Sequence, residues 1–238
     1  MTWRRIRAYL SNTRADAVCS GGLLSRRKAQ LSEPAAGAPV EALGRLLAAA
    51  PCGGAKVSLA LSCDFVRLVL LPPPARGLSA AELQALALDL LARSFGVDEH
   101  WRIRLASLGG TLFAAAVPEA LFAALTDAVA AAGGRLAAVR PAAAAALAAI
   151  ATPRQGAWVA VVEEGSTLVA LREAGAWRSV RVSPRGLSHW EQLLSQIERE
   201  RARLGSELRR LVCVSEAAPP PAAGWELRHS PARFALLA

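Results

Sequence analysis

The order of predicted strands and helices between Val57 and Ile150 constrains the fold of this chain more than any other feature. Alternating apolar residues, proline stops and glycine pairs predict the order strand–strand–helix–strand–strand–helix–strand–helix. A shorter block that begins at Trp158 repeats the opening, with strands, then a long helix, then a further strand. Such an order places mixed sheets between helices. The chain is therefore predicted to be an α/β protein whose mixed sheets are flanked by helices.

The clearest local signals lie in the first block. Residues 57–61 alternate between apolar and polar, and a short polar turn leads into the apolar run 65–71, which together predict a β-hairpin with one buried face. Ser79 followed by Glu82 has the spacing of a capping box and predicts the start of a helix that ends near Phe95.

The other elements follow from the same patterns. Further strands are predicted at 6–9, 16–20, 101–105, 111–117, 135–139, 158–162, 167–172, 177–182, 211–214 and 225–228, and further helices at 40–50, 118–132, 142–150 and 187–208. Residues 25–28 and 33–38 are predicted to be loops. The segment 152–156 is the predicted linker between a first lobe, residues 1–151, and a second, reduced lobe, residues 152–238.

Charge and hydropathy exclude several classes of protein. The net charge is +9, yet Lys28 and Lys56 are the only lysines among 28 basic residues, and the arginines are scattered rather than gathered in a nucleic-acid-binding module. Attraction to an acidic partner or to an anionic membrane surface is the general expectation. The longest apolar stretch, 142–151, is shorter than the roughly 20 residues of a membrane span, and the N-terminus does not resemble a signal peptide. A cytoplasmic protein is expected.

Residues that could carry metal or nucleophilic chemistry are few and dispersed. The four cysteines lack a Cys-x-x-Cys spacing, so they are predicted to be free, buried thiols: Cys19, Cys52, Cys63 and Cys213. The three histidines lie far apart and accompany no nucleophile motif, so they are predicted to be surface residues: His100, His189 and His229. No metal site and no catalytic residue is predicted.

Residues 57–147 resemble the cytoplasmic actin-like domains of bacterial assembly platforms, which are the GspL-type proteins of type II secretion and the PilM proteins of type IV pili. The resemblance rests on the segments VLLPPP, LSAAELQALALDLLARSFG, HWRIRLASLGGTLFAAAVP and LFAALTDAVAAAGGRLAAVRPAAAAAL. It implies an actin-like, ribonuclease H-like fold with two lobes. GspL-type proteins continue into a transmembrane helix and a periplasmic domain, and PilM-type proteins are longer, so the chain is expected to be a reduced platform domain.

The same resemblance directs attention to two turns that would bind phosphate in an actin-like ATPase. The first turn has Ser11-Asn12-Thr13 in place of an aspartate–glycine pair. The second has Glu163-Glu164-Gly165-Ser166-Thr167, which lacks the aspartate and the second glycine. If a nucleotide is bound, Gly165, Ser166 and Thr167 are the predicted contacts, although the two carboxylates would repel phosphate unless Mg²⁺ intervened. A polar hairpin turn with solvated glutamates is the simpler interpretation, and no cofactor is expected.

Tryptophan provides the candidate partner-binding residues. The chain has six tryptophans and one tyrosine, and most of the indoles fall on predicted elements, where they would anchor cores or edges. An exposed tryptophan beside arginine is typical of an interface hot spot. Trp177 and Arg178 are therefore predicted to contact a partner.

The resemblance and the altered turns together imply a non-enzymatic cytoplasmic scaffold of a type IV pilus or type II secretion assembly platform. It would bind an inner-membrane platform protein or the assembly ATPase, either in the groove between the lobes or by strand addition, near anionic lipids at the inner-membrane face. The alternative is a divergent actin-like ATPase that binds Mg-nucleotide between the lobes. A third hypothesis, a nucleic-acid-binding regulatory module, requires a steep dependence of binding on salt. No sequence feature defines the oligomeric state.

Overall fold

A computed structural model describes residues 4–21, 28–50, 52–73, 78–150, 156–184 and 190–232. The chain forms two compact units. Of the described residues, those within 4–66 and 117–145 belong to unit 1, and those within 67–116 and 146–232 belong to unit 2. Unit 2 therefore combines segments from both sides of residue 152, and the lobe boundary at that residue stays a prediction.

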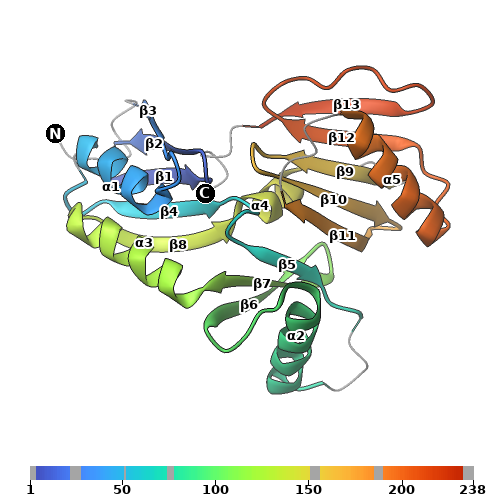
Figure 1. Cartoon of the computed structure of the whole chain (residues 1–238), viewed down its shortest axis with the longest axis horizontal. Coiled ribbons are helices and arrows are strands. Elements are labelled where there is room, and N and C mark those ends of the chain that lie inside the picture. Colours follow the sequence, from blue (N-terminus) through green and yellow to red (C-terminus); the bar gives the residue numbers. More distant parts are fainter. Residues whose placement is uncertain are drawn as a thin grey trace. The chain divides into compact units, whose positions relative to one another are not determined.

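Unit 1 contains one mixed sheet of five strands in the order β3-β2-β1-β4-β8 (Figure 1). Strands β1, β2 and β3 pair antiparallel, whereas β1, β4 and β8 pair parallel. Helix α1 contacts β2, β3 and α3, and helix α3 also contacts β8. The bounds are β1 Arg5–Leu10, β2 Arg14–Ser20, β3 Lys28–Pro34, α1 Pro39–Ala49, β4 Lys56–Leu61, α3 Glu119–Ala131 and β8 Arg135–Pro141, with α4 Ala142–Ala149 following β8.

Unit 2 contains a second five-stranded sheet, in the order β11-β10-β9-β12-β13, and a three-stranded sheet, in the order β5-β7-β6. Trp158 of β9 and Leu193 and Ile197 of α5 belong to one buried cluster, so α5 packs on the larger sheet. The bounds are β5 Arg67–Leu70, α2 Ala80–Phe95, β6 Trp101–Leu108, β7 Thr111–Pro118, β9 Ala157–Val162, β10 Ser166–Glu173, β11 Ala176–Pro184, α5 Trp190–Leu204, β12 Arg210–Ser215 and β13 Glu226–Pro231. In the described parts of the chain, none of the helices is both long and apolar enough to cross a membrane.

The two five-stranded sheets share one topology. Each begins with three antiparallel strands, continues through a helix, and returns as a strand that pairs parallel with the first strand of the sheet. The predicted repeat is therefore present, but its first copy starts at β1 rather than at residue 57. Sequence patterns missed this start because β3 reads as a polar loop.

The hairpin predicted from 57–61 and 65–71 is wrong. β4 lies between β1 and β8 and pairs parallel with both strands, while β5 pairs antiparallel with β7. The N–H of Ser62 donates to the carbonyl of Leu10 at 2.9 Å and so extends the parallel ladder. Because both edges of β4 are occupied, no edge of β4 is left for β5, even though the short turn between them would suit a hairpin.

Two further differences concern predicted loops and ends. β3, Lys28–Pro34, occupies residues that were predicted to be loop at 28 and 33–34, because pairing with β2 rather than apolar alternation makes it a strand. α5 ends at Leu204, where Gly205 has a left-handed φ of 64°, so the prediction that the helix continues to 208 is wrong. The predicted loop at 25–27, most of the linker 152–156 and the first residues predicted for α5 lie outside the described residues.

The hairpin of β6 and β7 and the start of α2 follow the sequence prediction. Gly109 and Gly110 join the strands with φ values of 57° and 77°, as a two-residue turn between right-twisted strands requires. The Ser79 hydroxyl accepts from the N–H of Glu82 at 3.3 Å, and the Glu82 carboxylate accepts from the N–H of Ser79 at 2.7 Å. This reciprocal pair is the predicted capping box.

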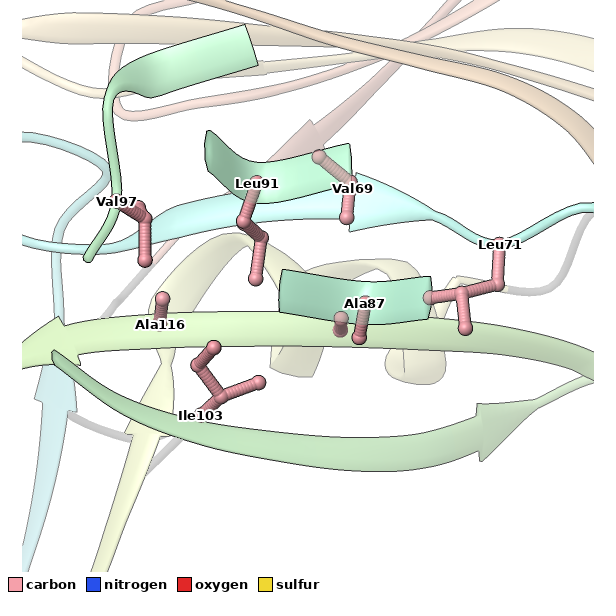
Figure 2. Close-up of a cluster of buried hydrophobic side chains, with 8 residues drawn as sticks. Val69, Leu71, Ala87, Leu91, Val97, Ile103 and Ala116 are labelled. Atoms are coloured by element: carbon pink, nitrogen blue, oxygen red, sulfur yellow. The ribbon is translucent and has the colours of Figure 1, made fainter. Parts of the chain in front are cut away.

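Helix α2 packs its apolar stripe against the three-stranded sheet. Figure 2 shows Ala87 and Leu91 of α2 among Val69, Ile103 and Ala116 of the strands. Ala87 and Leu91 are fully buried, whereas Leu88 on the same helix is 38% exposed. Helix α2 therefore packs on the core through a single face.

Leu91→Ala is expected to lower the free energy of unfolding by about 2–5 kcal/mol, because a buried leucine loses its transfer free energy and leaves a cavity. Leu88→Ala, on the same helix, is the matched control and is expected to change the free energy of unfolding by less than about 0.5 kcal/mol. Urea unfolding followed by tryptophan fluorescence measures both values. Equal losses in the two variants would contradict this packing.

The capping box predicts a dependence of stability on pH. Two hydrogen bonds lower the pKa of Glu82 below its ordinary value of 4.5. The larger effect comes from the backbone N–H of Ser79, and the smaller one comes from the hydroxyl of Ser79. The stabilising effect is therefore complete above the unfolded-state pKa and is lost as the pH falls through the lowered folded-state pKa. The difference in stability between the wild type and Glu82→Ala should shrink between pH 7 and pH 3. Glu41, which follows an N-cap without a side-chain hydrogen bond, provides the control variant Glu41→Ala.

Candidate functional site

The candidate site is a pair of tight turns, one in each five-stranded sheet. In each sheet the central strand, β1 or β9, turns directly into an antiparallel neighbour, and a parallel strand ends beside it. Ligands of α/β proteins bind outside the carboxyl ends of parallel strands. These two turns are therefore the positions at which phosphate-binding groups would be expected, and each is described within its own unit.

The turn of unit 1 is closed by its own serine. Ser11 is fully buried, and its hydroxyl accepts from the N–H groups of Thr13, at 3.3 Å, and Arg14, at 3.1 Å. The hydroxyls of Ser11 and Thr13 also lie 2.9 Å apart. Two of the backbone donors that could cradle an anion are thus committed to the side chain of the turn itself.

A carboxylate that the sequence interpretation did not select lies beside this turn. Asp64 follows β4, and its Oδ2 accepts from the hydroxyl of Ser62 at 3.0 Å and from the N–H of Asn12 at 3.5 Å. The signal in the sequence is Ser-x-Asp after a buried strand. Its proximity to Asn12 depends on the parallel pairing of β4 with β1, which the predicted hairpin obscured.

The turn of unit 2 brings the predicted contacts Gly165, Ser166 and Thr167 together. Ser166 and Thr167 are buried, and the hydroxyl of Ser166 donates to Oε2 of Glu163 at 2.8 Å. The N–H of Glu163 donates to the carbonyl of Ser166 at 2.9 Å and closes the hairpin. The hydroxyl of Ser166 is therefore engaged by a residue of its own turn. Nucleotide contact by Gly165, Ser166 and Thr167 stays a prediction.

The expectation of solvated glutamates holds for one of the two. Glu164 is exposed, but Glu163 is 4% exposed, so its solvation was predicted wrongly. The hydrogen bond from Ser166 supplies part of the polar environment that a buried carboxylate requires. In the described ranges, no group of three or more His, Cys, Asp or Glu side chains could hold a metal ion.

The predicted partner residues Trp177 and Arg178 differ in exposure. Trp177 is 3% exposed, packs edge-to-face on Phe113 with centroids 6.5 Å apart, and lies under the guanidinium of Arg172 at 5.7 Å. The premise of an exposed indole is therefore wrong, because β11 meets the three-stranded sheet at this point. Arg178 keeps 58% of its side chain exposed, and its contact with a partner stays a prediction.

The cysteines are free and buried, as predicted. Burial, with a smaller contribution from Cys19, raises the pKa of the Cys52 thiol to about 11. Of the histidines, His100 is exposed, and His229 is half-buried with Nε2 3.0 Å from the carbonyl oxygen of Ser215. His189 lies outside the described residues.

Three solved structures share the fold over nearly the whole chain. The cytoplasmic domain of EpsL, an inner membrane component of the type II secretion system of Vibrio cholerae, matches with a TM-score of 0.64 and 17% identity, over 98% of this chain and 91% of that chain. A chain of the PilM–PilN type IV pilus biogenesis complex matches with a TM-score of 0.71 and 16% identity, over 95% and 88%. A Bacteroides thetaiotaomicron protein of actin-like ATPase fold and unknown function matches with a TM-score of 0.67 and 8% identity, over 98% and 95%.

These likenesses define the class of fold. The chain has an actin-like ATPase fold, built from three sheets and, in the described residues, five helices. The predicted resemblance to GspL and PilM is confirmed at the level of structure. No protein family and no curated protein matches the sequence.

The closed turn of unit 2 gives a test by paired variants. Ser166→Ala removes a donor from the buried Glu163 and is expected to lower the free energy of unfolding by about 1–3 kcal/mol. Thr167→Val is the control, because Oγ1 of Thr167 has no hydrogen-bond partner in the described structure, so the change should be close to neutral. Urea unfolding measures both variants. A larger loss for Thr167→Val would contradict this geometry.

Proposed function

We propose that this protein is a non-enzymatic scaffold of a type II secretion or type IV pilus assembly platform. The observation that carries the proposal is the agreement in fold over at least 95% of the chain with the EpsL cytoplasmic domain and with a chain of the PilM–PilN complex. Both neighbours are named for bacterial envelope machinery. A chain of the same fold and similar extent is suited to the same kind of assembly.

The two turns support the absence of catalysis. The hydroxyl of Ser11 is engaged by the backbone of its own turn, and the hydroxyl of Ser166 is engaged by a buried carboxylate. A phosphate loop needs free N–H donors and small residues that let phosphate approach. The carboxyl group of Glu163 is buried in the same turn and accepts from the hydroxyl of Ser166. Both turns therefore favour a structural role over nucleotide turnover.

The proposed partners are an inner-membrane platform protein or the assembly ATPase, bound at the cytoplasmic face of the inner membrane. The net charge of +9 supports this placement, because a basic protein is attracted to anionic lipid headgroups. The charge is also suited to acidic surfaces on a partner, where complementary potentials raise the rate of association.

A second candidate function is a divergent actin-like ATPase, which one observation favours. Asp64 lies at the carboxyl end of β4, beside the turn of unit 1. Carboxylates at such a position suit Mg²⁺, which binds through one or two carboxylates and the phosphates of its substrate. Under this hypothesis, Asp64 would contact the Mg²⁺ of Mg-nucleotide.

Isothermal titration with Mg-ATP, with thermal melting in parallel, separates the two functions. The scaffold hypothesis predicts no heat of binding and no change in melting temperature. A Kd near 10 μM would instead stabilise the protein by about 2.7 kcal/mol at a hundredfold excess of ligand over Kd. Such stabilisation, lost in Asp64→Asn, would overturn the scaffold hypothesis and support the ATPase.

The scaffold hypothesis further predicts that the purified protein captures a platform protein or the assembly ATPase from detergent-solubilised membranes of its host. Mass spectrometry identifies the captured proteins, and Leu91→Ala, which is expected to destabilise unit 2, serves as a control for folding. Failure of the folded wild type to retain any such protein at low salt would contradict the proposed partners.

A further inference from the structure

Unit 2 has a groove between β5 and β11. Residues 68–70 of β5 and 178–182 of β11 form its two walls, and the end of α2 together with Arg203 of α5 completes it. Its volume is about 610 Å³. Figure 1 shows β5 beside β11, and the two strands are in contact. We call this surface the β5–β11 groove.

The groove has an apolar lining that is only partly covered. Leu70 of β5, Leu90 and Phe95 of α2, and Val180 and Val182 of β11 all line it, and each is half-buried. Apolar side chains in a concave surface provide favourable burial for apolar groups of a ligand. A purely ionic ligand would leave this lining unused.

Three arginines give the groove a positive charge. Arg178, Arg181 and Arg203 line it with 58%, 54% and 51% of their side chains exposed, and no Asp or Glu belongs to the lining. Glu200 lies 3.4 Å from Arg181 and 2.8 Å from Arg203, but its side chain is only 15% exposed. Glu173 lies 3.9 Å from Arg178, and its side chain is 35% exposed. The three guanidinium groups are therefore more exposed to solvent than the two carboxylates that pair with them.

Both walls are edges of sheets. In the described structure β11 pairs with β10 on one side only, and β5 pairs with β7 on one side only. The two strands are in contact with each other, and the backbone N–H of Trp177 in β11 donates to the hydroxyl of Thr111 in β7 at 3.0 Å. The edge of β11 therefore faces the three-stranded sheet, and the groove offers a ligand its side chains rather than a free strand edge.

We propose that the β5–β11 groove binds an extended, acidic segment of a partner protein through the side chains of its lining. Alternate residues of that segment would be apolar and lie on the half-buried lining, and the others would be Asp or Glu that pair with Arg178, Arg181 and Arg203. The proposal rests on the proposed function only in taking the ligand to be part of another protein. It adds the place and the chemistry of recognition.

Charge complementarity and the mixed lining favour a peptide over other anions. A carboxylate side chain accepts two parallel hydrogen bonds from guanidinium, and the alternating side chains of an extended peptide can meet the arginines and the apolar lining in turn. Single-stranded nucleic acid would need exposed aromatic rings for stacking, and Phe95, the only aromatic residue of the lining, is half-buried beneath the guanidinium of Arg67 at 5.9 Å.

The test is fluorescence polarisation with a labelled ten-residue peptide that alternates Val or Leu with Glu. A matched peptide with Lys in place of Glu is the probe control. The protein variant carries Arg178→Gln and Arg181→Gln. Arg45→Gln is its control, because Arg45 is 51% exposed, close to the 54% of Arg181, and forms an ion pair with Glu33 at 2.6 Å, but belongs to unit 1.

The acidic peptide is expected to bind and the basic peptide is not. The double variant should raise the Kd of the acidic peptide about tenfold, because exposed ion pairs contribute modestly and two are removed. Arg45→Gln should leave the Kd unchanged, and amide hydrogen exchange in 178–182 should slow when the peptide binds. Equal binding of both peptides, equal effects of the two protein variants, or unchanged exchange in β11 would each overturn the proposal.

The groove and the proposed function fail in different ways. If the protein binds the acidic peptide but captures no platform component, the scaffold function is contradicted and peptide binding in the groove is supported. If the double variant captures a platform component as well as the wild type does, peptide binding in the groove is contradicted and the scaffold function is supported. The thermal melt of the double variant, compared with that of Arg45→Gln, shows that lost binding is not lost folding.

Discussion

Parallel pairing between the first strand of each five-stranded sheet and the strand that returns after a helix is the constraint on which the rest of the structure depends. Parallel neighbours cannot be joined by a tight turn, so the chain must cross the sheet, and α1 and α5 serve as these crossovers. The same pairing aligns the carboxyl ends of β1 and β4 within hydrogen-bond distance. Ser62 and Asp64 consequently meet the turn of residues 11–13, although they lie far from it in the sequence.

The serine hydroxyl groups of the two turns at these carboxyl ends bond to partners within their own turns. The backbone of each turn has the form of a tight hairpin, but Ser11 and Ser166 turn their hydroxyls to internal partners. Burial makes this arrangement persistent, because a buried polar group that loses its partner has no water to replace it. The chain has the actin-like fold, and the serines of its two turns close those turns.

Unit 2 gains its candidate interaction surface from strands that remain unpaired on one side. β5 pairs with β7 instead of β4, so it becomes the edge of a small sheet, and β11 is the edge of a larger one. Trp177 packs on Phe113 where the two sheets meet, and its backbone N–H donates to the hydroxyl of Thr111 at 3.0 Å. The indole thus acts as an anchor inside the unit, while the neighbouring Arg178 remains available at the surface.

The sequence by itself determined most elements, because their signals are local. The capping box at Ser79, the glycine pair at Gly109 and the apolar periodicity of α2 depend on neighbours only a few residues apart. From these the mixed α/β class could be predicted, and the resemblance to GspL and PilM implied the actin-like fold.

Only the tertiary structure decided which strands pair and which side chains are buried. β4 was mistaken for half of a hairpin because nothing in its own residues shows that β1 and β8 occupy its edges. Glu163 and Trp177 were predicted to be exposed because a carboxylate in a turn and an indole beside arginine resemble surface residues. Their burial depends on hydrogen bonds and packing partners supplied by residues whose positions the fold sets, and local sequence patterns do not encode those distances.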